Sequence, residues 1–360
     1  MSVLSRRDFM QLTSAGPIAS LLSAARDTGN GPANGKNIIA DEKGDQRLSL
    51  EKLRAWEQLG YGMFIHFGMS TFDGDEYSKG DKNASLYNPD KLDPNQWAGV
   101  ARDAGMKYAV LTAKHVAGHC LWPTKYTDYH VGNSGNKTDL VEAFIKACRL
   151  KGIMPGLYYC AWDNHNLFGS GTPTHLTWAT AYTTTEYREF QWKQLEELLT
   201  QYGPVGEVWL DIPHFLTRDY RQKLYSQVAK WQPDAMILFN HGIGDGSEFI
   251  INTAWPTDGI TIERFVPNSN TGHVRWRQIE KKKYYMPAEV CDPIGKEWFY
   301  KETDAPRSDA ELLGMFLICR SRGANLLLDV PPDKHGLIPQ KFIDALQRLK
   351  GNIDKNNFTF

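Results

Sequence analysis

Acidic and aromatic residues that could take part in catalysis recur where apolar runs of the sequence end. The run Gly206–Ile212 carries a single carboxylate, Asp211, near its C-terminal end. Such a run is typical of a buried strand, and the C-terminal ends of barrel strands are where catalytic groups are found. Trp209 lies two residues earlier, on the same face of the expected strand. An ionised acid beside an aromatic ring is suited to attack on the anomeric carbon of a sugar, so Asp211 is our candidate nucleophile.

Glycoside hydrolysis also needs a second carboxyl group that holds a proton for the leaving oxygen. Glu263 lies in Thr261–Phe265 next to a cation, Arg264. Glu289 lies in the apolar run Met286–Val290, where burial would raise its pKa towards that of a proton donor. We favour Glu263 and retain Glu289 as the alternative.

Histidines and a lysine at the ends of other runs can donate hydrogen bonds to sugar hydroxyls. His66, Lys114 and His115 are the candidates of this kind. The competing interpretation is a metal site built from His66, His115 and Asp211, but the sequence has no HxH, HExxH or Cys/His cluster. It also lacks a nucleophilic serine elbow, a phosphate loop and a GxGxxG motif after a strand. We therefore expect neither a metal nor another cofactor.

Strand and helix patterns alternate along the chain and predict the scaffold that positions these groups. Helical spacing is found in Leu48–Leu59, Pro94–Ala104, Asp139–Lys151, Tyr187–Tyr202, Tyr220–Trp231, Ser308–Arg322 and Pro339–Lys350. Strand patterns are found in Tyr61–Gly68, Lys107–His115, Ile153–Cys160, Gly206–Ile212, Ala235–Asn240, Gly259–Phe265, Tyr284–Val290 and Ala324–Val330. Eight strands alternating with helices predict a single (β/α)8-like barrel. The helix signals are poorest between Asn240 and Trp298.

Composition excludes several classes of function. Of the 360 residues, 41 are Lys or Arg and 42 are Asp or Glu, and no basic stripe indicates a nucleic-acid partner. The five cysteines are scattered, without a CxxC pair, which argues for buried free thiols rather than a disulfide framework. The sequence leaves the oligomeric state open.

The N-terminal residues resemble an export signal. Arg6 and Arg7 precede a mildly apolar stretch, Leu12–Leu22, and Ser23–Ala25 offers small residues for cleavage, as in a twin-arginine export signal. The stretch is too short and polar to span a bilayer. We expect residues 1–26 to be the signal, 27–46 a linker and 47–360 the catalytic domain. The protein would then be exported to the periplasm or the exterior.

Five stretches together resemble glycoside hydrolase family 29, the α-L-fucosidases, from about Leu53 to Asn356. They are Tyr61–Gly68, Leu111–Trp122, Gly156–Cys160, Glu207–Asp211 and Ser321–Pro332. The resemblance implies a distorted barrel and a retaining, metal-free exo-hydrolase that acts on terminal α-L-fucosyl residues of glycans through a covalent glycosyl-aspartate. It also implies Asp211 as nucleophile and Glu263 as acid/base. The candidate substrate-binding residues are His66, Glu76, Tyr77, Lys114, His115, Tyr158, Trp209 and His241.

Three departures from the family pattern bear on the substrate. Val116 replaces a second histidine, His241 stands where an arginine is frequent, and Glu76-Tyr77 shortens a Glu-Trp-Tyr segment. An α-L-galactoside or a substituted fucose is therefore an alternative substrate, and a non-catalytic sugar-binding barrel is an alternative function. We expect no C-terminal β-sandwich of the kind many relatives carry.

Overall fold

A parallel sheet of eight strands forms the centre of the protein. The computed structural model describes residues 43–166, 182–356 and 358, and residues from Gly44 onward form one compact unit. The strands are β1 (Tyr61–Ile65), β2 (Tyr108–Lys114), β3 (Met154–Cys160), β4 (Glu207–Asp211), β5 (Met236–Phe239), β6 (Ile260–Glu263), β9 (Ala288–Pro293) and β10 (Ala324–Asp329). Their order is β5-β4-β3-β2-β1-β10-β9-β6, and every neighbouring pair is parallel. The predicted barrel is confirmed.

The barrel is nearly closed, with a seam between β5 and β6. At this seam side chains replace part of the backbone ladder. The N–H of Phe239 donates to Thr257 Oγ1 at 3.1 Å, and the N–H of Ile237 donates to Asp258 Oδ2 at 2.9 Å. The β5 amides that have no neighbouring strand at the seam are thereby satisfied within the fold.

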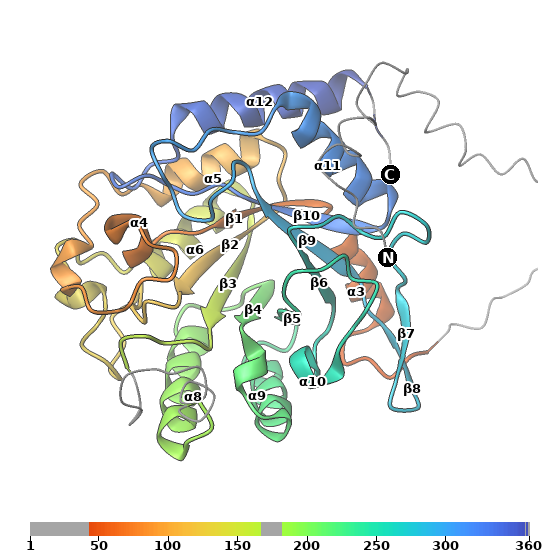
Figure 1. The fold of residues 1–360 in the computed structure, drawn as a ribbon, viewed down its shortest axis with the longest axis horizontal. Helices are drawn as coiled ribbons and strands as arrows, with labels where there is room; N and C mark the ends of the chain where they lie inside the picture. The colour runs from red at the N-terminus through yellow and green to blue at the C-terminus, as the bar shows by residue number, and fades with distance from the viewer. Residues whose placement is uncertain (1–42, 167–181, 357, 359–360) are drawn as a thin grey trace, which may run out of the picture. The chain divides into compact units, whose positions relative to one another are not determined.

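Helices surround the strands (Figure 1). They are α3 (Leu50–Glu57), α4 (Met69–Asp73), α5 (Pro94–Asp103), α6 (Leu140–Lys151), α8 (Thr185–Thr200), α9 (Arg218–Trp231), α10 (Ile251–Ala254), α11 (Asp309–Ser321) and α12 (Gln340–Lys355). Local sequence sets their ends. Asp139 caps α6 by accepting a hydrogen bond from the Glu142 N–H, and Gly152 ends the helix in the left-handed conformation, with φ of 71°. Among the described residues α12 is the last regular element, and no sandwich of strands follows it.

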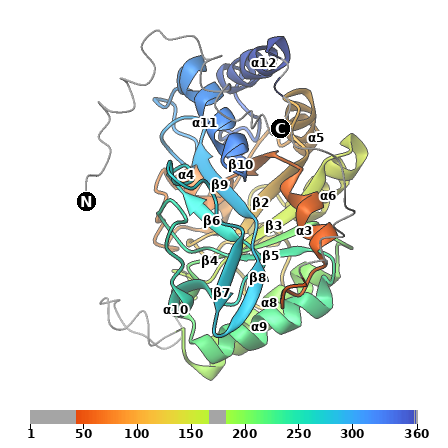
Figure 2. The same cartoon turned by 90° about the vertical axis from the view of Figure 1, so that its right-hand side faces the viewer.

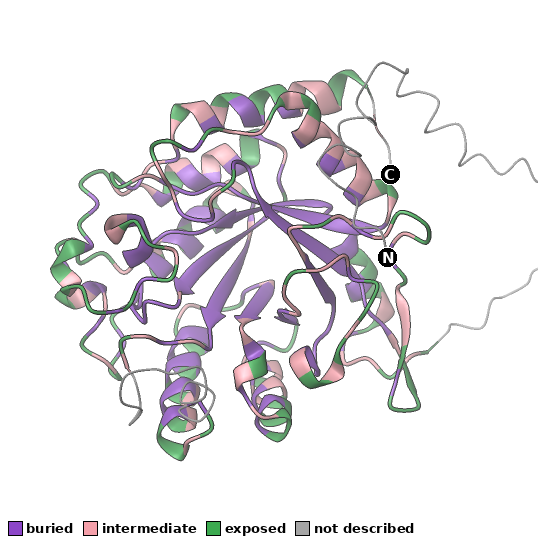
Figure 3. Ribbon diagram, in the orientation of Figure 1, coloured by how far each residue is buried: buried purple, intermediate pink, exposed green. Residues whose placement is uncertain are grey.

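Alternation along each strand divides the core into two layers. On β1, Met63 and Ile65 pack in the layer between strands and helices, whereas Phe64 points into the barrel with Tyr158 and Trp209. Both faces of the sheet are covered, so the strands are buried along their length (Figure 3).

The predicted strand Tyr284–Val290 is wrong as a single element. Its first half belongs to an antiparallel hairpin, β7 (Trp276–Ile279) and β8 (Lys282–Tyr285), seen at the side of the barrel in Figure 2. Pro287 has no N–H to continue a ladder, and the barrel strand β9 begins only after it. This hairpin lies where the barrel pattern calls for a helix, which explains the poor helix signals there.

The predicted export signal and most of the predicted linker lie outside the described residues. The last linker residues belong to the fold: the Asp45 N–H donates to the Lys283 carbonyl at 2.7 Å, and the Tyr285 N–H donates to Gln46 Oε1 at 3.3 Å. Within residues 43–166, 182–356 and 358, none of the helices has the length and apolarity needed to cross a membrane.

Candidate active site

A pocket opens at the C-terminal ends of the barrel strands. It brings together nine of the eleven predicted site residues, although they are far apart in the sequence. These are His66, Glu76, Tyr77, His115, Tyr158, Trp209, Asp211, His241 and Glu263. Further residues of the lining include Phe64, Val116, Ile212, His214, Asn240, Ile243 and Trp298.

Asp211, the last residue of β4, is held by three donors. The Tyr158 hydroxyl donates to its Oδ2 at 2.6 Å. The Asn240 Nδ2 and the Ile212 N–H both donate to its Oδ1, each at 2.8 Å. Three hydrogen bonds from two side chains and one backbone N–H fix the direction of this carboxylate. This is what a nucleophilic carboxylate requires.

Glu263, the last residue of β6, lies close to Asp211. The Asn240 Nδ2 that bonds Asp211 also donates to Glu263 Oε2, at 3.0 Å. Burial and the negative charge of Asp211 together raise the pKa of Glu263 to about 6, against the lowering effect of the Asn240 hydrogen bond. The environment of Glu263 is therefore suited to holding a proton.

Asn240 is a site residue that the sequence analysis missed. Its Oδ1 accepts hydrogen bonds from the Thr261 hydroxyl at 2.8 Å and from the Gly242 N–H at 3.0 Å. These bonds turn its amide nitrogen towards both carboxylates. The sequence feature that could have identified Asn240 is its position at the end of an apolar run, a position that Asp211 also has.

Each of the two carboxylates is followed by a residue in the left-handed conformation. Ile212 has φ of 53° and Arg264 has φ of 62°, and the other non-glycine residues of this kind in the described ranges form the β7–β8 turn. A β-branched residue such as Ile212 is strained there, at a cost of about 1–3 kcal/mol. The turn lets the Ile212 N–H reach the carboxylate of the preceding residue.

Two histidines form one wall of the pocket. The Nδ1 of His66 lies 2.8 Å from Asp329 Oδ1, which leaves Nε2 for the pocket. His115 stacks on Tyr158, with ring centroids 5.7 Å apart. Burial lowers the pKa of His115 well below its usual value, and the neighbouring His66 and Lys114 add to this. His115 is therefore neutral at pH 7.

The remaining lining residues come from loops at the mouth. His241 Nε2 accepts the Ile250 N–H at 2.9 Å, and burial lowers the pKa of this histidine. Glu76 and Tyr77 lie in the segment after α4, where Ser70 Oγ donates to the Glu76 carbonyl at 3.2 Å.

Glu289 lies outside the pocket lining, inside the barrel. It is the second residue of β9, and its side chain is 1% exposed. Its carboxylate accepts hydrogen bonds from the Tyr108 hydroxyl at 2.6 Å and from the Trp209 indole N–H at 3.0 Å. Burial raises its pKa, as the sequence analysis expected, but that position cannot reach a leaving group. Glu289 instead holds the indole of Trp209 in place by a hydrogen bond from inside the barrel.

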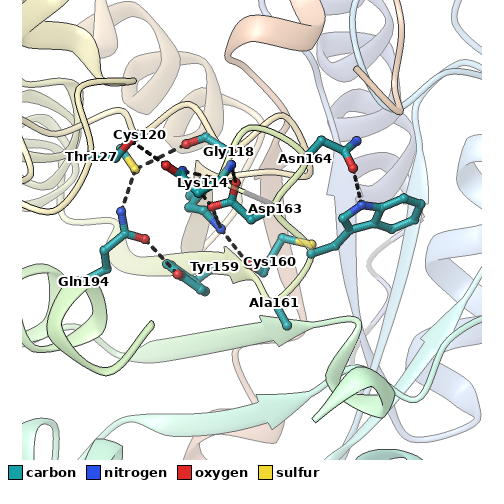
Figure 4. A network of polar contacts seen from close by, with 12 residues as sticks. Lys114, Gly118, Cys120, Thr127, Tyr159, Cys160, Ala161, Asp163, Asn164 and Gln194 are labelled. Atoms are coloured by element: carbon teal, nitrogen blue, oxygen red, sulfur yellow. Dashed lines mark hydrogen bonds and ion pairs between the residues drawn. The ribbon is translucent and has the colours of Figure 1, made fainter. Parts of the chain in front are cut away.

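Lys114 is likewise outside the pocket. Its Nζ lies 3.1 Å from Asp163 Oδ2 and 3.1 Å from the Cys160 carbonyl, and both charged side chains are 0% exposed (Figure 4). Successive strand residues face opposite sides, so Lys114 and His115 diverge. The predicted sugar contact of Lys114 is therefore replaced by an internal ion pair between β2 and the segment after β3.

Within the part of the chain that the structure describes, no three His, Cys, Asp or Glu side chains are grouped so as to hold a metal ion. His66 is instead paired with Asp329, and Asp211 with hydrogen-bond donors.

A nearly closed parallel barrel with paired carboxylates at its strand ends defines the class of barrel glycoside hydrolases. The family model described as α-L-fucosidase matches residues 40–357. The α-L-fucosidase 1 of Arabidopsis thaliana is 32% identical over 327 residues, which are 84% of this chain and 60% of that protein. This chain therefore belongs to the α-L-fucosidase family, glycoside hydrolase family 29, and the resemblance found in the sequence is confirmed.

Solved structures agree with this assignment. The α-L-fucosidase isoenzyme 1 of Paenibacillus thiaminolyticus superposes with a TM-score of 0.68 at 25% identity, covering 85% of this chain and 76% of that one. A glycoside hydrolase 29 family member from an unknown rumen bacterium gives 0.69 at 26% identity, covering 86% and 58%. This chain spans about 60% of the length of the plant relatives that it matches.

Proposed function

We propose that this protein is a retaining, exo-acting α-L-fucosidase that hydrolyses terminal α-L-fucosyl residues of glycans. The observation that carries the proposal is the single Asn240 nitrogen that bonds both Asp211 and Glu263. Because the Asp211 and Glu263 oxygens both bond this nitrogen, at 2.8 and 3.0 Å, the distance between them is at most the sum of these two lengths. Carboxyl groups of retaining enzymes are about 5–5.5 Å apart, and those of inverting enzymes at least about 6.5 Å.

In the first step Asp211 attacks the anomeric carbon, and Glu263 gives its proton to the oxygen of the departing group. A covalent glycosyl ester forms on Asp211 while the glycosidic bond breaks. Esterification removes the negative charge that helps to raise the pKa of Glu263. The pKa of Glu263 then falls, so the same residue takes a proton from water, which hydrolyses the ester.

The choice of sugar is supported by the family to which the chain belongs. A related α-L-glycoside, such as an α-L-galactoside, is the second candidate because Val116, a buried residue of the pocket lining, departs from the histidine of the family pattern. Valine offers no hydrogen bond to a hydroxyl, so this wall favours an apolar part of the sugar. A barrel that binds sugar without turnover is the remaining alternative from the sequence, and measurable hydrolysis excludes it.

The purified protein should release the aryl group from aryl α-L-fucosides, and its Asp211→Gly variant should not. Parallel assays with aryl α-L-galactosides separate the two candidate sugars. Equal, negligible release by the protein and its variant from both substrates would refute the proposed function. Proton NMR of the first-formed sugar tests retention, because an inverting enzyme releases the opposite anomer.

We further propose that residues 1–26 direct export, which places the enzyme in the periplasm or outside the cell. The support is the Arg6-Arg7 pair before the apolar stretch Leu12–Leu22. A reporter fused to residues 1–46 should be exported, and replacement of both arginines by lysine should retain it in the cytoplasm.

A further inference from the structure

Large apolar side chains are exposed around the mouth of the pocket. Tyr77 is 55% exposed and Ile243 is 70% exposed, and both line the pocket. Ile250 and Phe265, from the segments after β5 and β6, are also exposed. These four make up half of the exposed large apolar side chains recorded among the described residues. Two exposed apolar side chains that line one pocket, Tyr77 and Ile243, indicate a surface that binds a ligand.

Ile243 lies beside the proposed proton donor. An isolated bridge pairs Ile243 with Glu263, and the Gly244 N–H donates to the Glu263 carbonyl at 3.3 Å. The proton from Glu263 goes to the oxygen that joins the sugar to its aglycone. An aglycone must therefore leave the pocket past the neighbours of Glu263, of which Ile243 is one.

Tyr77 reaches the same mouth from the segment after α4. Burial and the nearby charges of Glu76, Glu263 and Asp211 together raise the pKa of its hydroxyl to about 12. Although exposed, Tyr77 is well positioned. Its N–H donates to Asp75 Oδ1 at 3.0 Å, and its ring centroid lies 5.9 Å from that of Trp162.

The segment that carries Trp162 is itself anchored to the barrel. Asn164 Nδ2 donates to the Ser78 carbonyl at 2.7 Å, next to Tyr77. Asp163 forms the buried ion pair with Lys114 (Figure 4). The Lys114–Asp163 pair thus anchors the segment whose Trp162 contacts Tyr77.

We propose that Tyr77 and Ile243 form an aglycone subsite, which binds a leaving group that presents an apolar face about the size of one ring. The proposal rests on the proposed glycosidase function and adds the chemistry of the leaving group to it. Neither side chain is charged, and an aromatic ring packs well against an aryl group or the C–H face of a pyranose. An aryl group and a pyranose both present such a face, so either can make these contacts.

The test compares substrates with and without an aglycone. The variants are Tyr77→Ala and Ile243→Ser, and Leu150→Ser on α6 is the control, since Leu150 is 75% exposed and does not line the pocket. Substrates are α-L-fucosyl fluoride, which has no aglycone, an aryl α-L-fucoside and a fucosylated disaccharide. For each variant, kcat/KM on an aglycone-bearing substrate is divided by kcat/KM on the fluoride.

We expect this ratio to fall about ten-fold in both pocket variants and to stay constant in the control. A fall confined to the aryl substrate identifies a hydrophobic aglycone, and a fall confined to the disaccharide identifies a sugar. Unchanged ratios on both substrates would overturn the subsite. Failure of the parent protein to hydrolyse the fluoride would instead overturn the proposed function, so the two failures are distinguishable.

Discussion

The carboxylate of Asp329 accepts two hydrogen bonds from His66. Asp329 Oδ1 lies 3.1 Å from the backbone N of His66 and 2.8 Å from its Nδ1. Asp329 is the last residue of β10 and is fully buried. The pair fixes the imidazole ring and keeps the proton on Nδ1, so that Nε2 is available to a sugar hydroxyl.

Asp329→Asn should therefore lower kcat/KM about ten- to a hundred-fold, because the amide holds the ring of His66 less firmly than a carboxylate does. The distinguishing readout is a double-mutant cycle with His66→Ala. If Asp329 acts by positioning His66, its replacement should cost little once the imidazole is gone. A full additional loss in the double variant would show that Asp329 acts on the fold instead.

Asn240→Ala should reduce kcat about a hundred-fold by removing a donor shared by the nucleophile and the acid. The Asn240 hydrogen bond lowers the pKa of Glu263. Its loss should therefore move the alkaline limb of the pH profile to higher pH. Thr261→Val removes the hydroxyl that donates to Asn240 Oδ1 and accepts the His241 N–H, but keeps the Asn240 amide, so it should produce a smaller change in the same direction. A limb that stays in place would contradict the proposed link between Asn240 and Glu263.

The scaffold and most of the pocket could be predicted from the sequence, because both depend on local patterns. Asp211 and Glu263 end apolar runs, and parallel strands bring such ends to one face. Asn240 ends a similar run, but its role depends on bonds from Thr261 and Gly242 that no local pattern reveals.

The position of a side chain along its strand, and the side of the strand that it faces, were harder to predict than the strand itself. Glu289 pairs in register with Asn325 near the start of β10, far from the C-terminal strand ends where the pocket opens, whereas the sequence showed only an apolar run. Lys114 is next to His115 in sequence but turns towards Asp163, whose contribution depends on the path of the segment after β3. Both errors concern the position of a side chain in three dimensions: Glu289 lies on a strand whose predicted start was wrong, and Lys114 lies on a strand that was predicted correctly.

The activity of the parent protein should fall as the pH rises through about 6. Burial and the charge of Asp211 raise the pKa of Glu263 to about 6, and only the protonated form can donate to a leaving group. Above that pH the protonated fraction decreases about ten-fold per pH unit, and kcat/KM for a poor leaving group should follow it. A flat profile from pH 5 to pH 8 with such a substrate would argue against Glu263 as the donor.

Glu263 and Glu289 should respond differently to the leaving group. Glu263→Ala should slow hydrolysis of a substrate with a poor leaving group by at least about a hundred-fold, and have a smaller effect with a good one. Glu289→Gln should change both substrates by a similar factor, because Glu289 bonds Trp209 and Tyr108 rather than the substrate. A strong dependence on the leaving group in Glu289→Gln would restore it as the acid.

Glu207 and Glu289 form a buried acidic pair that should make stability depend on pH. Burial raises the pKa of both groups, and the negative charge of Glu289 raises that of Glu207 further. The folded protein then binds a proton that the unfolded chain has lost. Stability should therefore be greatest below the pKa of the unfolded carboxyl and decrease as the pH rises through the higher folded values, by up to about 1.4 kcal/mol per pH unit for each proton.

Glu207→Gln retains a polar side chain of the same shape but cannot ionise. Between pH 5.5 and 8.5 its free energy of unfolding in urea should decrease less steeply than that of the parent protein. The Trp56 indole N–H, which donates to Glu207 Oε2 at 3.0 Å, still finds an oxygen in this variant. Glu196→Gln, at an exposed site on α8, is the matched control and should follow the parent curve. Parallel curves for the parent and Glu207→Gln would show that Glu207 does not carry the proton.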